Sequence, residues 1–151
     1  MALPFFSIDM SKEELLTYVS SLMSARGTVD NQNSKFVVEM EKRYLGFQVV
    51  LGSAARQLFY LLLKTSFKPG DEIIFPAMGF PLYVKMALQL KLVPVLVDVE
   101  SEHLTLDPKL LRKAITAKTK AVVVTHLFGH PAQIHEIVKI ADEAGIRVIE
   151  D

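Results

Sequence analysis

Short apolar runs alternate with amphipathic helical patterns along this chain from residue 47 onward. The apolar runs span residues 47–51, 72–76, 93–99, 121–127 and 147–151, and the helical patterns span 53–66, 81–91, 107–116 and 132–144. Nearly continuous apolar strands separated by helices are typical of a parallel sheet, because helices then bury both of its faces. The fold class expected from the sequence is therefore α/β, with three α/β/α layers and a mostly parallel sheet.

Signals at the ends of these segments support the same assignment. The segment Lys68-Pro69-Gly70-Asp71 predicts a turn before the run EIIFP. Asp107 is a helix cap followed by Pro108 at the first helical position, and Gly145 ends the helix over 132–144. The helix over 53–66 is expected to bury one face, made of Ala55, Leu58, Leu61, Leu62 and Thr65.

Residues 1–46 are expected to form an N-terminal helical segment ahead of the sheet. Ser11 and Glu14 have the spacing of a capping box, which predicts a first helix. Ser34 is predicted to cap a second helix that ends at Gly46. The side chains expected to face inward from that helix are Phe36, Val37, Met40 and Tyr44. The predicted division is therefore 1–46 for the helical segment and 47–151 for the sheet domain.

The composition excludes several classes of protein. The chain of 151 residues has 17 Lys and Arg, 17 Asp and Glu, and no Cys. Balanced charge argues against a nucleic-acid partner, and the lack of thiols excludes disulfides, iron–sulfur clusters and thiolate metal sites. The N-terminus lacks the basic and apolar stretches of a signal peptide, and the run Leu58–Leu63 is too short to span a membrane. We therefore expect a cytoplasmic protein with no membrane and no nucleic-acid partner.

The corner Gly52-Ser53-Ala54, between the first apolar run and the first helix of the sheet domain, has the features of an anion site. Backbone N–H groups at a helix start are free, the helix dipole is positive there, and the Ser53 hydroxyl can donate. Small residues also let an anion approach the backbone closely. The alternative is an ordinary strand–helix corner in which Ser53 is the N-cap.

Ligands of parallel α/β sheets bind beyond the carboxyl ends of the strands. The residues expected there, besides the corner at 52–54, are Pro76–Phe80, Asp98, His126–Gly129, Glu150 and Asp151. The simpler interpretation of His126 is a buried histidine with satisfied hydrogen bonds, and the remaining histidines lack metal-ligand spacing. The motifs GxGxxG and GxSxG and the P-loop lysine are not present in this sequence.

Several sequence blocks occur in the order of one known family. They are MEKRYLG at 40–46, GSAA at 52–55, KPGDEIIFPAMGF at 68–80, PVLVDVE at 94–100, LTLDPKLLRKAITAKTKAVVVTHLFGHPAQIHEI at 104–137 and IRVIED at 146–151. The chain resembles the DegT/DnrJ/EryC1/StrS family of pyridoxal-phosphate (PLP) sugar aminotransferases, which have the aspartate-aminotransferase fold (fold type I). The resemblance covers nearly the whole chain and implies that residues 47–151 are an incomplete PLP-binding large domain.

The resemblance also implies roles for the residues that match the family's motifs. The backbone of Gly52-Ser53-Ala54 and the Ser53 hydroxyl would hold the PLP phosphate. Phe80 would stack on the pyridine ring, and Asp151 would pair with the pyridine nitrogen. His126 falls in a block that lies near the cofactor, and Asp98 is expected to shape a corner without taking part in the chemistry.

The chain departs from the family pattern at several positions. Leu51-Gly52-Ser53 stands where Ser-Gly-Thr is usual, Arg56 stands where an apolar residue is usual, and Gly79 replaces a threonine. The Schiff-base lysine and the small C-terminal domain of the family follow its Glu-Asp block, which here is Glu150-Asp151. No lysine of this sequence is therefore expected to be the catalytic residue.

By resemblance, the complete enzyme would transfer an amino group from an amino acid, commonly glutamate, to a keto-sugar carried by a nucleotide. It would serve cell-surface polysaccharide or secondary-metabolite synthesis as a homodimer. Sugar dehydratases of the same family carry a histidine in place of the lysine, which leaves that activity as an alternative. A catalytically inactive truncated domain or interaction module is a further alternative. A nucleotide-binding α/β domain unrelated to PLP would need a phosphate loop richer in glycine.

The family fold predicts a strand order as well. The four runs from 72–76 to 147–151 are expected to form a contiguous parallel sheet in the order third, second, fourth, fifth. The first run, 47–51, has its family neighbours in strands that follow the fifth. Its backbone groups would therefore either stay unpaired or dock against 147–151.

Overall fold

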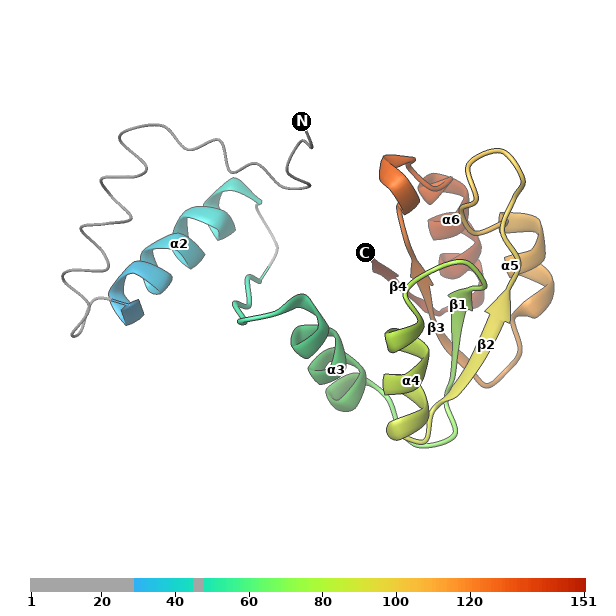
Figure 1. Ribbon diagram of the computed structural model, residues 1–151, viewed down its shortest axis with the longest axis horizontal. Helices are drawn as coiled ribbons and strands as arrows, with labels where there is room; N and C mark the ends of the chain where they lie inside the picture. Colours follow the sequence, from blue (N-terminus) through green and yellow to red (C-terminus); the bar gives the residue numbers. More distant parts are fainter. Residues whose placement is uncertain (1–28, 45–47) are drawn as a thin grey trace, which may run out of the picture. The chain divides into compact units, whose positions relative to one another are not determined.

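Figure 1 shows the chain as a computed structural model in which residues 29–44 and 48–151 are described. The chain divides into two compact units, Met1–Leu51 and Gly52–Asp151. The helix predicted at Ser11 and the helix end predicted at Gly46 lie outside the described residues. None of the helices in the described ranges is long and apolar enough to cross a membrane.

The first unit contains the helix α2 (Val29–Arg43). Because Ser34 lies inside α2, the predicted cap at that residue is wrong. Residues 29–33 include no Gly or Pro, and polar side chains alone do not stop a helix. Phe36 and Tyr44 are 51% and 50% exposed, which contradicts the inward face predicted for them.

The second unit is built on a four-stranded sheet in which all neighbouring strands are parallel. Its strands are β1 (Glu72–Pro76), β2 (Val93–Val97), β3 (Thr119–Val124) and β4 (Arg147–Glu150). Their order is β2-β1-β3-β4, which confirms the predicted order third, second, fourth, fifth. The register pairs Ile74 of β1 with Val95 on one side and with Val122 on the other.

Residues 48–51, the described part of the apolar run 47–51, form no strand. In the described part of the chain, β4 pairs only with β3. Val50 and Leu51 remain 73% and 41% exposed. A β-strand is held by hydrogen bonds to a neighbour, and this run has none within the sheet.

Helices cover both faces of the sheet (Figure 1), as the sequence predicts. On one face, α3 (Ala55–Ser66) and α4 (Pro81–Gln89) pack against Ile73, Phe75 and Val123. On the other face, α5 (Pro108–Ala114) and α6 (Ile134–Ala144) pack against Ile74, Val122 and Val124. Neighbouring strand residues face opposite layers because side chains alternate along a strand. The three-layer α/β/α architecture is thereby confirmed.

The predicted helix ends are also observed. Asp107 caps α5, since its Oδ1 accepts from the backbone N–H groups of Lys109 at 2.7 Å and Leu110 at 3.4 Å. Gly145 ends α6 in the left-handed conformation with a φ of 65°, which glycine adopts without a Cβ clash. The helices of the second unit therefore begin and end within a few residues of the positions that the caps indicate.

The buried face of α3 differs from the prediction. Phe59 and Leu63 are buried, whereas Leu61 and Leu62 of the predicted face are 51% and 41% exposed. The consecutive residues 58–63 of α3 are all apolar or aromatic and therefore lie on every side of the helix. Periodicity alone cannot then identify the side that faces the sheet. The choice follows from packing, because the ring of Phe59 stacks on that of Tyr83 in α4, with centroids 4.0 Å apart and planes 24° apart.

Two neighbouring leucines test this assignment of the α3 faces. Leu63→Ala is expected to lower the free energy of unfolding by about 2–5 kcal/mol, since it leaves a cavity in the core. Leu62→Ala removes a partly exposed side chain and is expected to cost less than about 1 kcal/mol. Urea unfolding of the two variants measures both values. A larger loss for Leu62→Ala would contradict the packing described above.

Candidate functional site

The carboxyl ends of the strands and the starts of the helices meet at one edge of the second unit (Figure 1). Phe80 follows β1 as the N-cap residue of α4, His126 follows β3, and Asp151 follows β4. Because all four strands are parallel, these three predicted residues lie at the same edge.

Asp151 extends the ladder between β3 and β4. Its N–H donates to the carbonyl of Val124 at 2.8 Å, and its carbonyl accepts from the N–H of His126 at 3.1 Å. The carboxylate Oδ1 accepts a hydrogen bond from the Tyr83 hydroxyl at 3.0 Å. The other oxygen, Oδ2, has no hydrogen-bond partner among the described residues. The backbone of Asp151 is thus fixed, and one carboxylate oxygen is available to a ligand.

Tyr83 joins α4 to the end of β4 through this bond. Its side chain is only 7% exposed. Burial raises the pKa of its phenol, and the hydrogen bond to Asp151 and the negative charge of that carboxylate raise it further. Tyr83 therefore remains a neutral donor across the physiological pH range.

An aromatic cluster of Phe59, Tyr83 and Phe80 connects α3, α4 and this edge. Tyr83 lies in the middle, with its ring stacked on that of Phe59. It also makes an edge contact with Phe80, with ring centroids 5.3 Å apart and ring planes at 80° to each other. Phe80 is 53% exposed, so it presents a ring to solvent at the edge. Such pairs hold ring orientation at a gain of about 0.5–1.5 kcal/mol each.

A cavity of about 300 Å³ opens at the same edge, between α4 and the ends of β1 and β3. Its polar lining comes from Tyr83, Lys85 and Thr125. The apolar lining includes Phe75, Pro76, Phe80, Val84, Leu96 and Val123. A mostly apolar cavity with a few polar groups is a typical small-molecule site.

The corner at residues 52–54 stands at the start of α3. Ala54 is the N-cap residue and no side chain caps the helix, so the alternative of Ser53 as N-cap is wrong. The Ser53 hydroxyl instead donates to Oε1 of Gln57 at 2.6 Å. The free N–H groups of the first turn are therefore not occupied by a side chain, which is what an anion site requires.

Gly52 packs closely against the helix that it precedes. A Cβ at this position would lie 2.7 Å from Cγ and Cδ2 of Leu58. The lack of space for a larger residue at Gly52 therefore comes from the Leu58 side chain. The approach of an anion to this backbone stays a prediction. In the described residues no hydrogen bond or ring contact joins residues 52–54 directly to Asp151.

His126 is held on both sides of its ring. Nδ1 accepts from the backbone N–H of Ala132 at 3.0 Å, and Nε2 lies 3.3 Å from Oε1 of Glu150. An accepting Nδ1 places the proton of the neutral ring on Nε2. This arrangement closes the loop between β3 and α6, and it satisfies both ring nitrogens as the simpler interpretation predicts. The side chain is 29% exposed, so the burial expected for His126 is wrong.

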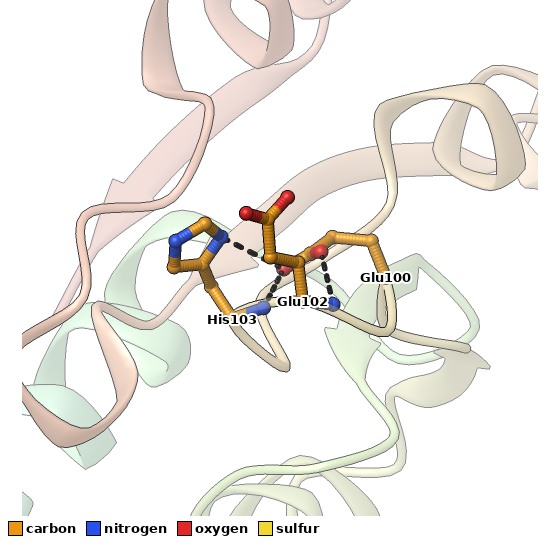
Figure 2. Close-up of side chains that lie close together, drawn as sticks. All are labelled: Glu100, Glu102 and His103. Atoms are coloured by element: carbon orange, nitrogen blue, oxygen red, sulfur yellow. Dashed lines mark hydrogen bonds and ion pairs between the residues drawn. The ribbon is translucent and has the colours of Figure 1, made fainter.

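A cluster of Glu100, Glu102 and His103 was not identified from the sequence (Figure 2). Oε2 of Glu100 accepts from the N–H of Glu102, and Oε1 from the N–H of His103, each at 2.8 Å. Burial opposes ionisation, but these backbone donors lower the pKa of Glu100 overall. The carboxylate therefore closes the turn between β2 and α5, and its oxygens are already used for that purpose.

Sequence comparison identifies the family. The sequence pattern of the DegT/DnrJ/EryC1/StrS aminotransferase family matches residues 9–151. The chain belongs to this family. The family resemblance carried by the sequence blocks is thereby confirmed.

Three relatives illustrate the match. The lipopolysaccharide biosynthesis protein RfbH of Salmonella typhimurium is 41% identical over 149 residues, covering 92% of this chain and 34% of that protein. The Escherichia coli GDP-4-keto-6-deoxy-D-mannose-3-dehydratase, solved with hydrated PLP, is 26% identical with a TM-score of 0.85, covering 99% of this chain and 40% of that one. NtdA of Bacillus subtilis, solved with bound PMP, is 25% identical with a TM-score of 0.79, covering 98% and 36%.

The chain thus spans about a third to two fifths of the length of these relatives. The structural matches confirm that its sheet corresponds to part of a fold-type-I PLP enzyme. Tyr83, which contacts both Phe80 and Asp151 at this edge, is not among the residues predicted from the sequence. A signal was available, because Tyr83 lies three residues after Phe80 and residues at that spacing share a helix face.

Gly52 provides a test of the packing at the start of α3. Gly52→Ala is expected to destabilise the protein by about 1–3 kcal/mol, because the new methyl group overlaps Leu58. In a Leu58→Ala background the same change is expected to cost almost nothing. Thermal unfolding of the four proteins of this cycle measures the coupling. Equal costs in both backgrounds would contradict the steric explanation.

Proposed function

We propose that this chain forms the ring- and phosphate-binding part of a PLP-dependent enzyme that acts on a nucleotide-linked keto-sugar. The observation that carries the proposal is the Asp151 carboxylate, held at Oδ1 by Tyr83 and unpaired at Oδ2, beside the exposed ring of Phe80. In this proposal residues 47–151 belong to the cofactor-binding domain and residues 1–46 to the helical segment. The enzyme is a cytoplasmic homodimer, and it serves cell-surface polysaccharide or secondary-metabolite synthesis.

The described residues fit the cofactor that crystal structures of the relatives contain. A pyridine nitrogen that carries a proton needs an anionic acceptor, and Oδ2 of Asp151 is such an acceptor. A flat ring needs an accessible aromatic face, which Phe80 offers. A phosphate needs free N–H groups, which Ala55 and Arg56 at the start of α3 supply. It also accepts from a hydroxyl, and Ser53 would provide one by exchanging its hydrogen bond to Gln57 for one to the phosphate.

Bound PLP supplies an electron sink, provided that its ring nitrogen stays protonated. Asp151 keeps the proton on that nitrogen by placing a negative charge beside it. Phe80 holds the ring plane, and the apolar cavity wall excludes water on that side. The first turn of α3 binds the phosphate through backbone N–H groups, which fixes the far end of the cofactor.

The reaction that we favour is transfer of an amino group from an amino acid such as glutamate to the keto-sugar. Support comes from membership of an aminotransferase family and from the similarity to a lipopolysaccharide biosynthesis protein. Dehydration of the keto-sugar is the second candidate. It is favoured by the structural likeness to the Escherichia coli 3-dehydratase, with a TM-score of 0.85.

Product analysis distinguishes these candidates in the full-length protein. The protein is incubated with PLP, glutamate and GDP-4-keto-6-deoxymannose, and the sugar product is identified by mass spectrometry and NMR. An amino sugar is expected. A 3-deoxy keto-sugar without nitrogen would assign the dehydratase, and an unchanged sugar together with no PLP binding would assign an inactive domain or interaction module.

Two adjacent carboxylates test the role of Asp151. Asp151→Asn in the full-length protein is expected to lower kcat by about 100-fold or more, since one charge that stabilises the transition state is worth about 3 kcal/mol. Glu150→Gln is the matched control and is expected to leave kcat nearly unchanged, because that side chain is 57% exposed and approaches His126. Steady-state kinetics measures both.

Phe80 contributes position and no charge. Phe80→Leu is expected to lower kcat by roughly tenfold or less, the equivalent of about 1 kcal/mol from a lost ring contact. The same kinetic assay ranks it against Asp151→Asn. Equal losses for the two variants would contradict the assignment of the electrostatic role to Asp151.

A further inference from the structure

We propose that Tyr83 is a positioning residue for the cofactor. It holds Oδ1 of Asp151 so that Oδ2 faces the ring nitrogen. The inference rests on the function proposed above. It assigns a role to a helix residue that the sequence motifs do not include.

The Asp151 carboxylate needs such a partner. Its backbone is fixed by the two ladder hydrogen bonds to Val124 and His126, but the terminal torsion of an aspartate is broad and roughly two-fold. Among the described residues the Tyr83 hydroxyl is its one side-chain hydrogen-bond partner. Without that hydroxyl the carboxylate would be free to rotate at the end of β4.

Tyr83 itself has little freedom. Its ring is stacked on Phe59 on one side and meets Phe80 at its edge, and its side chain is buried. Its backbone N–H donates to the carbonyl of Phe80 at 3.1 Å in the first turn of α4. A rigid side chain loses little entropy on making a hydrogen bond, so the hydroxyl oxygen defines where Oδ1 lies.

The hydroxyl is also suited chemically to this role. It remains a neutral donor, so it stabilises the anionic form of Asp151. Its single O–H occupies Oδ1 alone, which leaves Oδ2 for the ring nitrogen. Because Phe80 is the N-cap residue of α4 and Tyr83 lies in its first turn, the ring-stacking group and the group that orients the nitrogen partner form one rigid unit. A displacement of α4 would therefore move both together.

Binding of pyridoxamine phosphate (PMP) to the full-length protein tests the proposal, since PMP forms no covalent bond to a lysine. Tyr83→Phe keeps the stacked ring and removes only the hydroxyl. It is expected to weaken PMP binding about tenfold, as is typical for losing a hydrogen bond to a charged group. In an Asp151→Asn background the same change is expected to weaken binding less than about twofold.

Tyr60→Phe is the matched control, because the Tyr60 hydroxyl has no partner among the described residues and the ring lies partly buried against the same core. It is expected to leave PMP affinity unchanged. Equal weakening by Tyr83→Phe in both backgrounds would show that Tyr83 acts through packing alone, and would overturn the proposal. If the unmodified protein binds no PMP, the proposed function fails and this inference fails with it. Normal PMP binding together with an unaffected Tyr83→Phe variant overturns only the inference.

A pH titration without cofactor provides a second test. The ultraviolet difference between the parent protein and Tyr83→Phe is expected to show one tyrosine that ionises above the ordinary pKa of about 10. Since the folded-state pKa is raised, the stability that this group contributes is present below that pH and is lost as the pH rises through the folded value. Asp151→Asn is expected to lower the ionisation pH only in part, because burial is the larger cause. If Tyr83 instead ionises at the ordinary pH of a tyrosine, and if Asp151→Asn leaves that pH unchanged, the contact between Tyr83 and Asp151 is contradicted.

Discussion

The pairing of β1 with β3 at the centre of a parallel sheet is the interaction on which the second unit depends. These strands are buried on both faces, so each needs a helix layer above and below it, and four helices supply those layers. Parallel pairing also brings all strand carboxyl ends to one edge. The same constraint that builds the core therefore gathers Phe80, His126 and Asp151, which lie far apart in the sequence.

A residue of α4 connects the helix layer to this edge. The hydrogen bond from Tyr83 to Asp151 joins the first turn of α4 to the end of β4. The stacking of Tyr83 on Phe59 extends the connection to α3, whose start is the proposed phosphate-binding turn. One buried tyrosine thus links the groups proposed to bind the phosphate, the ring face and the ring nitrogen. This explains how parts with no direct contact can keep a common geometry.

The sequence predicts the sheet and its helix caps because those signals are local or periodic. Asp107 and Gly145 are examples, and the strand order follows from the family resemblance. The buried face of α3 was not predictable, since apolar side chains lie on several sides of that helix. The contact of Phe59 with Tyr83 decides which side is buried, and that contact is tertiary. The start of α2 differs from the prediction because residues 29–33 contain no Gly or Pro to stop a helix, although they are mostly polar. The Tyr83–Asp151 bond joins residues 68 positions apart, and no single-sequence pattern reports such a contact.

Strand periodicity explains why Asp151, and not the neighbouring Glu150, is the carboxylate that meets Tyr83. Val148 packs on the face covered by α5 and α6, and Ile149 packs on the face covered by α3 and α4. Continuing the alternation by two residues directs Glu150 towards His126 and Asp151 towards Tyr83, as the two observed contacts confirm. A shift of β4 by one residue against β3 would exchange the two acids. The β3–β4 register therefore decides which carboxylate meets the helix layer that carries Phe80.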